Sequence, residues 1–307
     1  MSTAFYTHAD CQRHEMGDWH PECPARLQAI DDQLIASRID MVLERVDAPM
    51  IDEGELARVH LPAYIDELRH RRPEHGYVDL DSDTRLNPFT WQAALRAAGA
   101  AVAATDAVLA GEYDNAFCSV RPPGHHAEPD RAMGFCFFNN VALAARHALD
   151  VHGLSRVAIV DFDVHHGNGT EMAFANEPRV LMCGLFQHPF YPFSGDPPLG
   201  ANMANTPLPA RTDGAQMRDI ASRTWLPRLD AFAPELVLIS AGFDAHIEDD
   251  MGNLALREAD YAWLTARIMA IAARHANGRI VSCLEGGYNL SALGRSVVAH
   301  LRELAQV

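Results

Sequence analysis

Histidines and aspartates in this chain are spaced in a way that suits metal-assisted hydrolysis. In DFDVHHGNG (161–169), Asp163 and His165 lie two residues apart, and such residues face the same side of an extended segment. This pair could address one ion, and Asp244 in AGFDAH would add a second carboxylate. Two carboxylates and one imidazole suit Zn²⁺ with an open coordination position. Asp163, His165 and Asp244 are therefore the candidate metal ligands.

A tandem pair, His125 and His126, follows the stiff Pro-Pro-Gly turn of RPPGHHA. One imidazole could take a proton from a metal-bound water while the other supports charge in the transition state. Each needs an orienting acceptor, for which Asp161 and Asn168 are the candidates. Tyr288 follows a Gly-Gly pair, and its hydroxyl could donate to a substrate carbonyl and to the oxyanion formed from it.

Short apolar runs precede these polar segments, and we expect them to be buried strands of a parallel sheet. Helical patterns alternate with the runs, which favours an α/β sheet with helices on both faces. Ligand sites in such sheets lie beyond the carboxyl ends of the strands. Residues 1–85 are less regular. The expected strands are 116–120, 156–164, 179–186, 234–242 and 279–284, and the expected helices are 26–37, 90–109, 140–151, 215–232, 258–275 and 290–304.

Composition narrows the class of protein further. The chain has 307 residues, 48% of them hydrophobic, which is enough apolar material for a large core. Lys+Arg is 25 and Asp+Glu is 41, and a net charge of −16 argues against nucleic-acid binding but is compatible with a cationic substrate. The six cysteines form no C-x-x-C pair. With no apolar leader and no long apolar run, we expect a cytoplasmic protein that does not engage a membrane.

Seven motifs, spread over nearly the whole chain, carry a family resemblance. They are HPECPARL (20–27), DLDSDT (79–84), RPPGHHAE (121–128), GFCFFNN (134–140), DFDVHHGNGT (161–170), AGFDAH (241–246) and EGGYNL (285–290). Together they resemble the histone deacetylase superfamily, closest to the class II and bacterial deacetylase-like amidohydrolases and related to the acetylpolyamine amidohydrolases. The resemblance implies an arginase-like α/β fold: one domain over residues 1–307 around an eight-stranded parallel sheet with helices on both faces.

The resemblance also implies the chemistry. The three candidate ligands would hold one zinc ion per chain. His126 would be the general base and then the general acid, oriented by Asn168, and asparagine at that position is the class II form. His125, paired with Asp161, would act mainly electrostatically. Tyr288 would polarise the scissile carbonyl of an acylated amine, with acetyl-lysine the leading substrate.

Substrate-binding residues are implied in the same way. Phe135, which follows Gly134, would form one wall of an acyl-lysine tunnel, and Tyr191 in PFYPFSG the opposite wall. Met251 would lie at the tunnel mouth, where polyamine deacetylases can carry a glutamate. Its lack of charge favours acyl-lysine or another monocationic or neutral amide. Nearby Asp250, in place of the family's proline, and the other acidic loop residues favour a more cationic substrate.

Potassium is implied near residues 161–165, bound chiefly through main-chain oxygens, although Gly184 stands where many members carry a serine ligand.

The sequence does not favour a dimanganese ureohydrolase of the same fold, because the carboxylate pattern that would bind a second metal ion is missing. A deacetylase of polyamines or other small molecules is the closer alternative, and a catalytically weak acyl-ligand-binding protein the more remote one. A homo-oligomer is left open.

Overall fold

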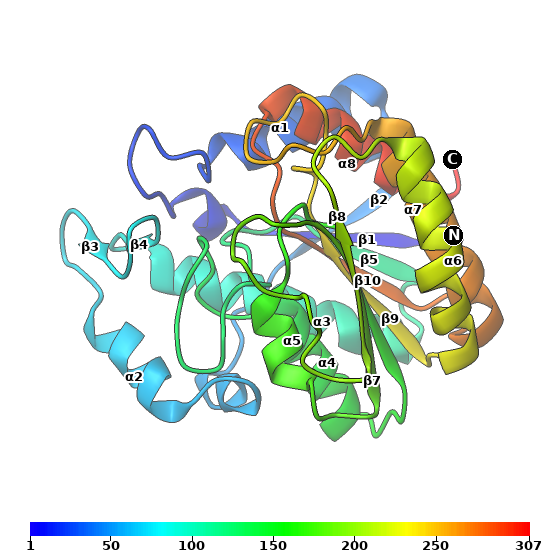
Figure 1. Ribbon diagram of the computed structural model, residues 1–307. Helices are drawn as coiled ribbons and strands as arrows, with labels where there is room; N and C mark the ends of the chain where they lie inside the picture. Colours follow the sequence, from blue (N-terminus) through cyan, green and yellow to red (C-terminus); the bar gives the residue numbers. More distant parts are fainter.

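The computed structural model describes residues 1–307 and is built around one eight-stranded sheet. Its order is β2-β1-β5-β10-β9-β6-β7-β8, and every neighbouring pair runs parallel. A short antiparallel pair, β3–β4, lies apart from it (Figure 1). The strands are β1 Thr3–Thr7, β2 Leu43–Asp47, β3 Val78–Asp79, β4 Arg85–Leu86, β5 Asn115–Cys118, β6 Val157–Asp161, β7 Val180–Gln187, β8 Met203–Leu208, β9 Leu236–Ala241 and β10 Ile280–Leu284.

Helices cover both faces of the sheet, as Figure 1 shows. One layer contains α3 and α4, which pack on each other and on the central strands, while α1, α8, α7 and α6 pack in series on the other face. The α-helices are α1 Ala25–Ser37, α2 Pro62–His70, α3 Thr90–Ala110, α4 Asn140–Asp150, α5 Asn168–Phe174, α6 Gly214–Phe232, α7 Glu258–His275 and α8 Leu290–Ala305; the 3-10 helices are η1 Ala9–Gln12, η2 Ile39–Val42 and η3 Glu53–Arg58.

The sequence-based predictions are confirmed for all five strands and all six helices, with ends shifted by a few residues. The parallel α/β architecture with eight strands is confirmed as well. The periodicity left three strands of the main sheet unassigned, β1, β2 and β8, and also missed α2 and α5. Helix α3 is long and apolar enough to pass for a membrane span, but 67% of its most apolar window is buried inside the protein, as in a core helix.

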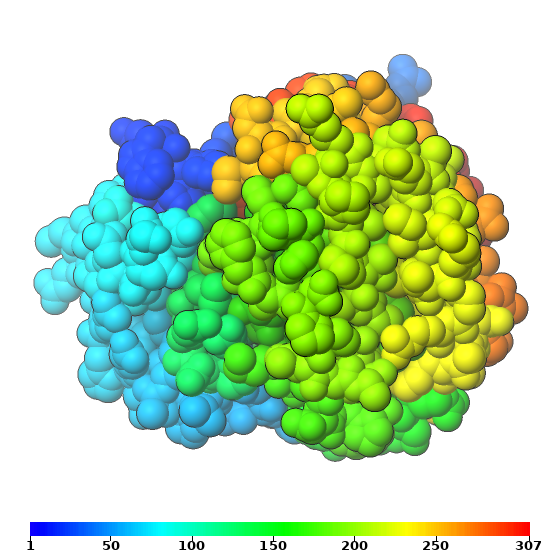
Figure 2. Space-filling model, in the orientation of Figure 1, coloured from blue at the N-terminus to red at the C-terminus, as the bar shows by residue number.

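The irregular N-terminal third has an apolar cluster of its own. Tyr64 of α2 and Trp91 of α3 each pack edge to face against Phe138, beside the main core. In Figure 2 this part of the chain, coloured blue to cyan, lies beside the green loops that follow β7. The cluster therefore anchors the loops of residues 71–89 next to the carboxyl edge of the sheet.

Candidate active site

Four neighbouring strands at the centre of the sheet, β5, β10, β9 and β6, end at the same edge. The segment after β5 carries the two tandem histidines, and the segment after β6 carries Asp163 and His165. Asp244 follows β9, and Tyr288 follows β10. The structure thus brings together all eight residues for which the sequence predicts a metal-binding or catalytic role, and seven of them are less than one-tenth exposed.

The three candidate ligands form one compact group. Nδ1 of His165 lies 3.0 Å from Oδ1 of Asp163 and 3.3 Å from Oδ2 of Asp244. The other carboxylate oxygens are held by the backbone, because Gly286 N–H donates to Asp163 Oδ2 and Val164 N–H donates to Asp244 Oδ1. One oxygen of each aspartate therefore faces the imidazole.

Buried charge at this group fits a divalent cation. Asp244 Oδ2 is buried and has no hydrogen-bond donor. Burial and the charge of Asp163 raise the pKa of Asp244 to about 7, so the two carboxylates resist being ionised together. Burial would lower the pKa of His165, but the two nearby aspartates, one hydrogen-bonded and one in ion-pair range, outweigh burial and raise it to about 10. A divalent metal ion would offset the repulsion between the two buried carboxylates better than a single proton would. Two carboxylates and one imidazole are a donor set that Zn²⁺ accepts.

The tandem histidines have unlike environments although their rings lie 4.0 Å apart. His125 Nδ1 lies 3.0 Å from Asp161 Oδ2. Burial opposes protonation of His125, but the charges of Asp163 and Asp161 raise its pKa well above the usual value. For His126, burial and then the charges of His125 and His165 lower the pKa well below the usual value. These opposite shifts favour an imidazolium at His125 and a neutral imidazole at His126.

His126 is oriented by Asn168, the first residue of α5, whose Oδ1 lies 2.8 Å from its Nδ1. The Asn168 amide group donates to Oε1 of Glu128 at 2.6 Å. Glu128 belongs to the RPPGHHAE motif, but the sequence analysis assigned it no role.

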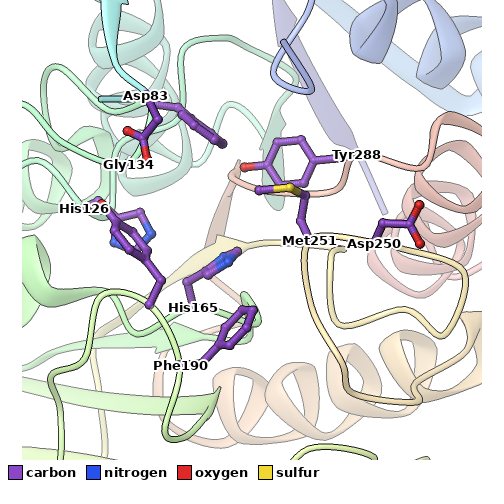
Figure 3. Close-up of a pocket in the computed structure, with 10 residues that line it drawn as sticks. Asp83, His126, Gly134, His165, Phe190, Asp250, Met251 and Tyr288 are labelled. Atoms are coloured by element: carbon purple, nitrogen blue, oxygen red, sulfur yellow. The ribbon is translucent and has the colours of Figure 1, made fainter. Parts of the chain in front are cut away.

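A pocket of about 300 Å³ opens onto these groups. Phe135 and Tyr288 meet edge to face with ring centroids 5.8 Å apart, and Phe190 stacks on His165. Figure 3 shows the hydroxyl of Tyr288 turned into the pocket. The predicted Gly134, Phe135, Tyr191 and Met251 all line the pocket, together with Asp83, His126, His165, Phe190, Asp250 and Tyr288.

Two buried charged residues hold the catalytic loops, and the sequence analysis gave them no role. Oε2 of Glu285 accepts from the backbone N–H groups of Gly124 and His125, at 2.7 and 3.1 Å. Arg26 donates to the carbonyl of Gly287 at 2.7 Å, and its guanidinium lies 4.9 Å from the ring centroid of Tyr288. Both residues occur in recognised motifs, but their partners lie more than 150 positions away, so no local spacing reveals them.

Comparisons with known proteins agree with this architecture. A model of the histone deacetylase domain matches residues 20–304. The chain is 37% identical to the histone deacetylase-like amidohydrolase of Pseudomonas aeruginosa, over 94% of this chain and 77% of that protein. It is 36% identical to the polyamine deacetylase HDAC10 of Homo sapiens, over 99% of this chain and 48% of that protein. The crystal structure of the HDA15 HD domain matches with a TM-score of 0.93 and 33% identity, covering 99% of this chain and 88% of that chain.

An eight-stranded parallel sheet between helical layers, with a buried polar group at its carboxyl edge, defines a protein of the arginase/deacetylase fold. The chain belongs to the histone deacetylase family, and the resemblance read from its motifs is confirmed. Membership of this family supports the interpretation that the protein is a hydrolase with deacetylase activity.

Proposed function

We propose that the protein is a zinc-dependent amidohydrolase that removes an acyl group, acetyl in the first instance, from an amine such as the lysine side chain. The observation that carries the proposal is the union of three features in one pocket. These are a buried Asp–His–Asp group whose His165 lines the pocket, a pair of histidines with opposite pKa shifts of which His126 lines the pocket, and the Tyr288 hydroxyl turned into it. Binding of an acyl ligand alone would need neither the base nor the oxyanion donor.

In this proposal Asp163, His165 and Asp244 hold the zinc ion. When bound, the ion supplies Lewis-acid polarisation and lowers the pKa of water. The unpartnered Asp244 Oδ2 and the raised pKa of that carboxyl support this assignment.

The remaining steps belong to side chains of the chain itself. His126 is neutral because of its lowered pKa, and its Nε2 removes a proton from the attacking water. The Tyr288 hydroxyl donates a hydrogen bond to the substrate carbonyl oxygen. It keeps this hydrogen bond as negative charge develops on that oxygen, and so stabilises the oxyanion. Burial holds the pKa of Tyr288 well above its usual value, so the phenol keeps the proton it donates. His126 then protonates the leaving amine, and His125 stabilises the charge from beside it.

Potassium is a second part of the proposal, placed near the main chain of residues 161–165. Gly184 pairs with Asp161 in the sheet and with Asn205 on its other side. The buried Oδ1 of Asn205 has no donor and lies 4.0 Å from the position of a Cβ at Gly184. This amide oxygen supports a cation site in which Asn205 replaces the serine hydroxyl of other members.

Acetylated polyamines are the second candidate substrate, and a specific observation favours them. Two carboxylates, Asp83 and Asp250, line the pocket, and a second ammonium group of a polyamine would meet them there. Met251, also in the lining, contributes no charge and supports an acyl-lysine instead. The two substrates differ in charge beyond the reacting amide, so a direct competition distinguishes them.

Release of amine tests the proposal directly. The chain contains no lysine, so an amine-reactive dye detects the product of a fully capped acetyl-lysine amide with little signal from the enzyme. A monoacetylated diamine already has a free amine, so for this substrate the released acetate is measured instead. Metal-free protein should be inactive on both N-acetyl-lysine amide and monoacetylated diamine, and should regain turnover with zinc. His126→Ala should bind zinc but release no amine. Full turnover by the metal-free protein, or by zinc-loaded His126→Ala, would contradict the proposal.

A further inference from the structure

A second group of metal-ligating side chains lies at the far end of α4 from the catalytic loop. It contains Asp106, one residue before the last turn of α3, His147, in the last turn of α4, and His152, just beyond that helix. Nε2 of both histidines approaches one carboxylate oxygen, Asp106 Oδ1, at 2.7 and 2.6 Å. One donor atom from each residue lies within 4.8 Å of the others. None of these residues lines the active-site pocket.

We propose that Asp106, His147 and His152 form a second site for a divalent transition-metal ion of the zinc class. Two imidazoles and one carboxylate are a donor set that Zn²⁺, Co²⁺ and Ni²⁺ share, whereas Ca²⁺ and Mg²⁺ prefer oxygen donors. The carboxylate of Asp106 is half exposed, so water can complete the coordination shell.

The surroundings of His147 support a metal ligand over a simple hydrogen-bonded histidine. The residue is 8% exposed, and its buried Nδ1 has no hydrogen-bond partner. Glu55 Oε2 lies 3.6 Å from that nitrogen, just outside hydrogen-bond range. Metal-bound histidines commonly donate their other N–H to a carboxylate, which fixes the tautomer and the ring. A small rotation of either side chain would complete that arrangement.

The helix ends add to the attraction for a cation. Helices α3 and α4 pack together, and the group lies near the carboxyl ends of both, where unpaired carbonyls carry partial negative charge. Asp106, an anion close to the carboxyl end of α3, is unfavourable there unless positive charge compensates it. An ion would tie α3 to α4 and to the turn after α4, and would therefore stabilise the fold increasingly as the free metal concentration rises above the dissociation constant.

Metal stoichiometry tests the site independently of the active site. Metal-stripped protein is titrated with Co²⁺, and bound metal is measured by calorimetry and by the visible absorption of the ion. His152→Ala should bind one equivalent fewer than the wild type and keep its deacetylase activity. His275→Ala is the matched control, because His275 pairs with Asp230 at 2.8 Å in the same way but without a second imidazole. This control should bind as the wild type does.

A second variant separates metal binding from simple hydrogen bonding. Glu55→Gln leaves all three ligands in place but weakens the acceptor for His147 Nδ1, and should reduce the affinity for Co²⁺ at this site roughly tenfold. In the wild type and His275→Ala, added Zn²⁺ should raise the melting temperature more than in His152→Ala. Equal stoichiometry and equal melting shifts in the wild type and His152→Ala would overturn the proposal.

Discussion

The Glu128 carboxylate accepts a hydrogen bond from the Asn168 side-chain amide at 2.6 Å, and this contact fixes which end of the amide faces His126. A carboxylate offers only acceptors, so the amide nitrogen must point to Glu128 and the amide oxygen to the imidazole. Asn168 Oδ1 then accepts from Nδ1–H of His126, which leaves Nε2 of this neutral ring as the free base. In the proposed mechanism, Glu128 thus acts on the general base His126 through Asn168.

Glu128→Gln tests this positioning role. A glutamine can both donate and accept, so Asn168 can turn over and present its nitrogen to His126, which disfavours the reactive tautomer. We expect kcat to fall roughly tenfold with little change in KM, since outer partners of this kind commonly have effects of that size. Arg131→Gln is the control, because it removes the cation paired with Glu128 but keeps the carboxylate. Equal losses in the two variants, or a loss confined to KM, would rule out the role.

Phe135→Ala tests the pocket wall. The Phe135 ring contacts Tyr288 edge to face and lines the cavity, so its loss should widen the channel and release the acyl chain. We expect kcat/KM for acetyl-lysine amide to fall by roughly tenfold or more, as for truncation of a well-buried contact. Leu199→Ala, an exposed side chain, serves as the matched control. Unchanged kcat/KM in Phe135→Ala would remove this residue from the substrate site.

Asp250→Asn tests recognition of a second positive charge. If the Asp250 carboxylate at the pocket pairs with a distal ammonium, its loss should raise KM for a monoacetylated diamine several-fold and leave KM for a neutral-capped acetyl-lysine amide unchanged. Added salt should reduce the difference between the wild type and the variant, because exposed ion pairs are screened. Equal KM changes for both substrates would indicate that Asp250 does not distinguish the two substrates by their charge.

A buried histidine that does not line the pocket, His300, predicts a dependence of stability on pH. Burial lowers the pKa of His300 to about 3, and its ring nitrogens contact Thr265 and Ser282. As the pH falls below the ordinary value, the unfolded chain takes up a proton that the folded protein refuses. The free energy of unfolding should therefore fall by about 1.4 kcal/mol per pH unit from this residue.

His300→Gln removes the titratable imidazole, and the glutamine amide can still form polar contacts with Thr265 and Ser282. We expect this variant to be less stable than the wild type near neutral pH by about 1–2 kcal/mol. Between about pH 6 and pH 4 its stability should fall less steeply, by the contribution of one proton. Urea denaturation at a series of pH values measures both slopes. Parallel curves for the two proteins would show that His300 does not titrate in this way.

The central strands could be predicted because they are buried on both faces and are continuously apolar, as in Val157–Asp161 and Leu236–Ala241. The strands that were missed lie toward or at the sheet edges. Leu43–Asp47 is largely exposed and charged, and Met203–Leu208 contains a proline, so neither carries the pattern of a buried strand. Edge strands are identified by their neighbours in the sheet, which the local sequence does not contain.

Some residues of the candidate site could also be predicted from the sequence, and others could not. Residues at strand ends, such as Asp163 and Asp244, could be found because parallel strands place their carboxyl ends at one edge. Glu128, Glu285 and Phe190 could not be assigned roles, because each acts through a contact with a residue distant in the sequence. Recognition of a motif locates such residues, but only the three-dimensional contacts say what they hold.

We propose that Tyr288 and a zinc ion held by the Asp–His–Asp group together hydrolyse an acyl amide. Turnover of acetyl-lysine amide by the wild type and Tyr288→Phe, with zinc content measured in both, tests it most directly. We expect robust wild-type turnover that falls roughly 100-fold or more in Tyr288→Phe at equal zinc content, the loss typical of an oxyanion donor. Undiminished turnover in the variant, or a wild type that holds zinc but cleaves neither acetyl-lysine nor acetylpolyamines, would contradict it.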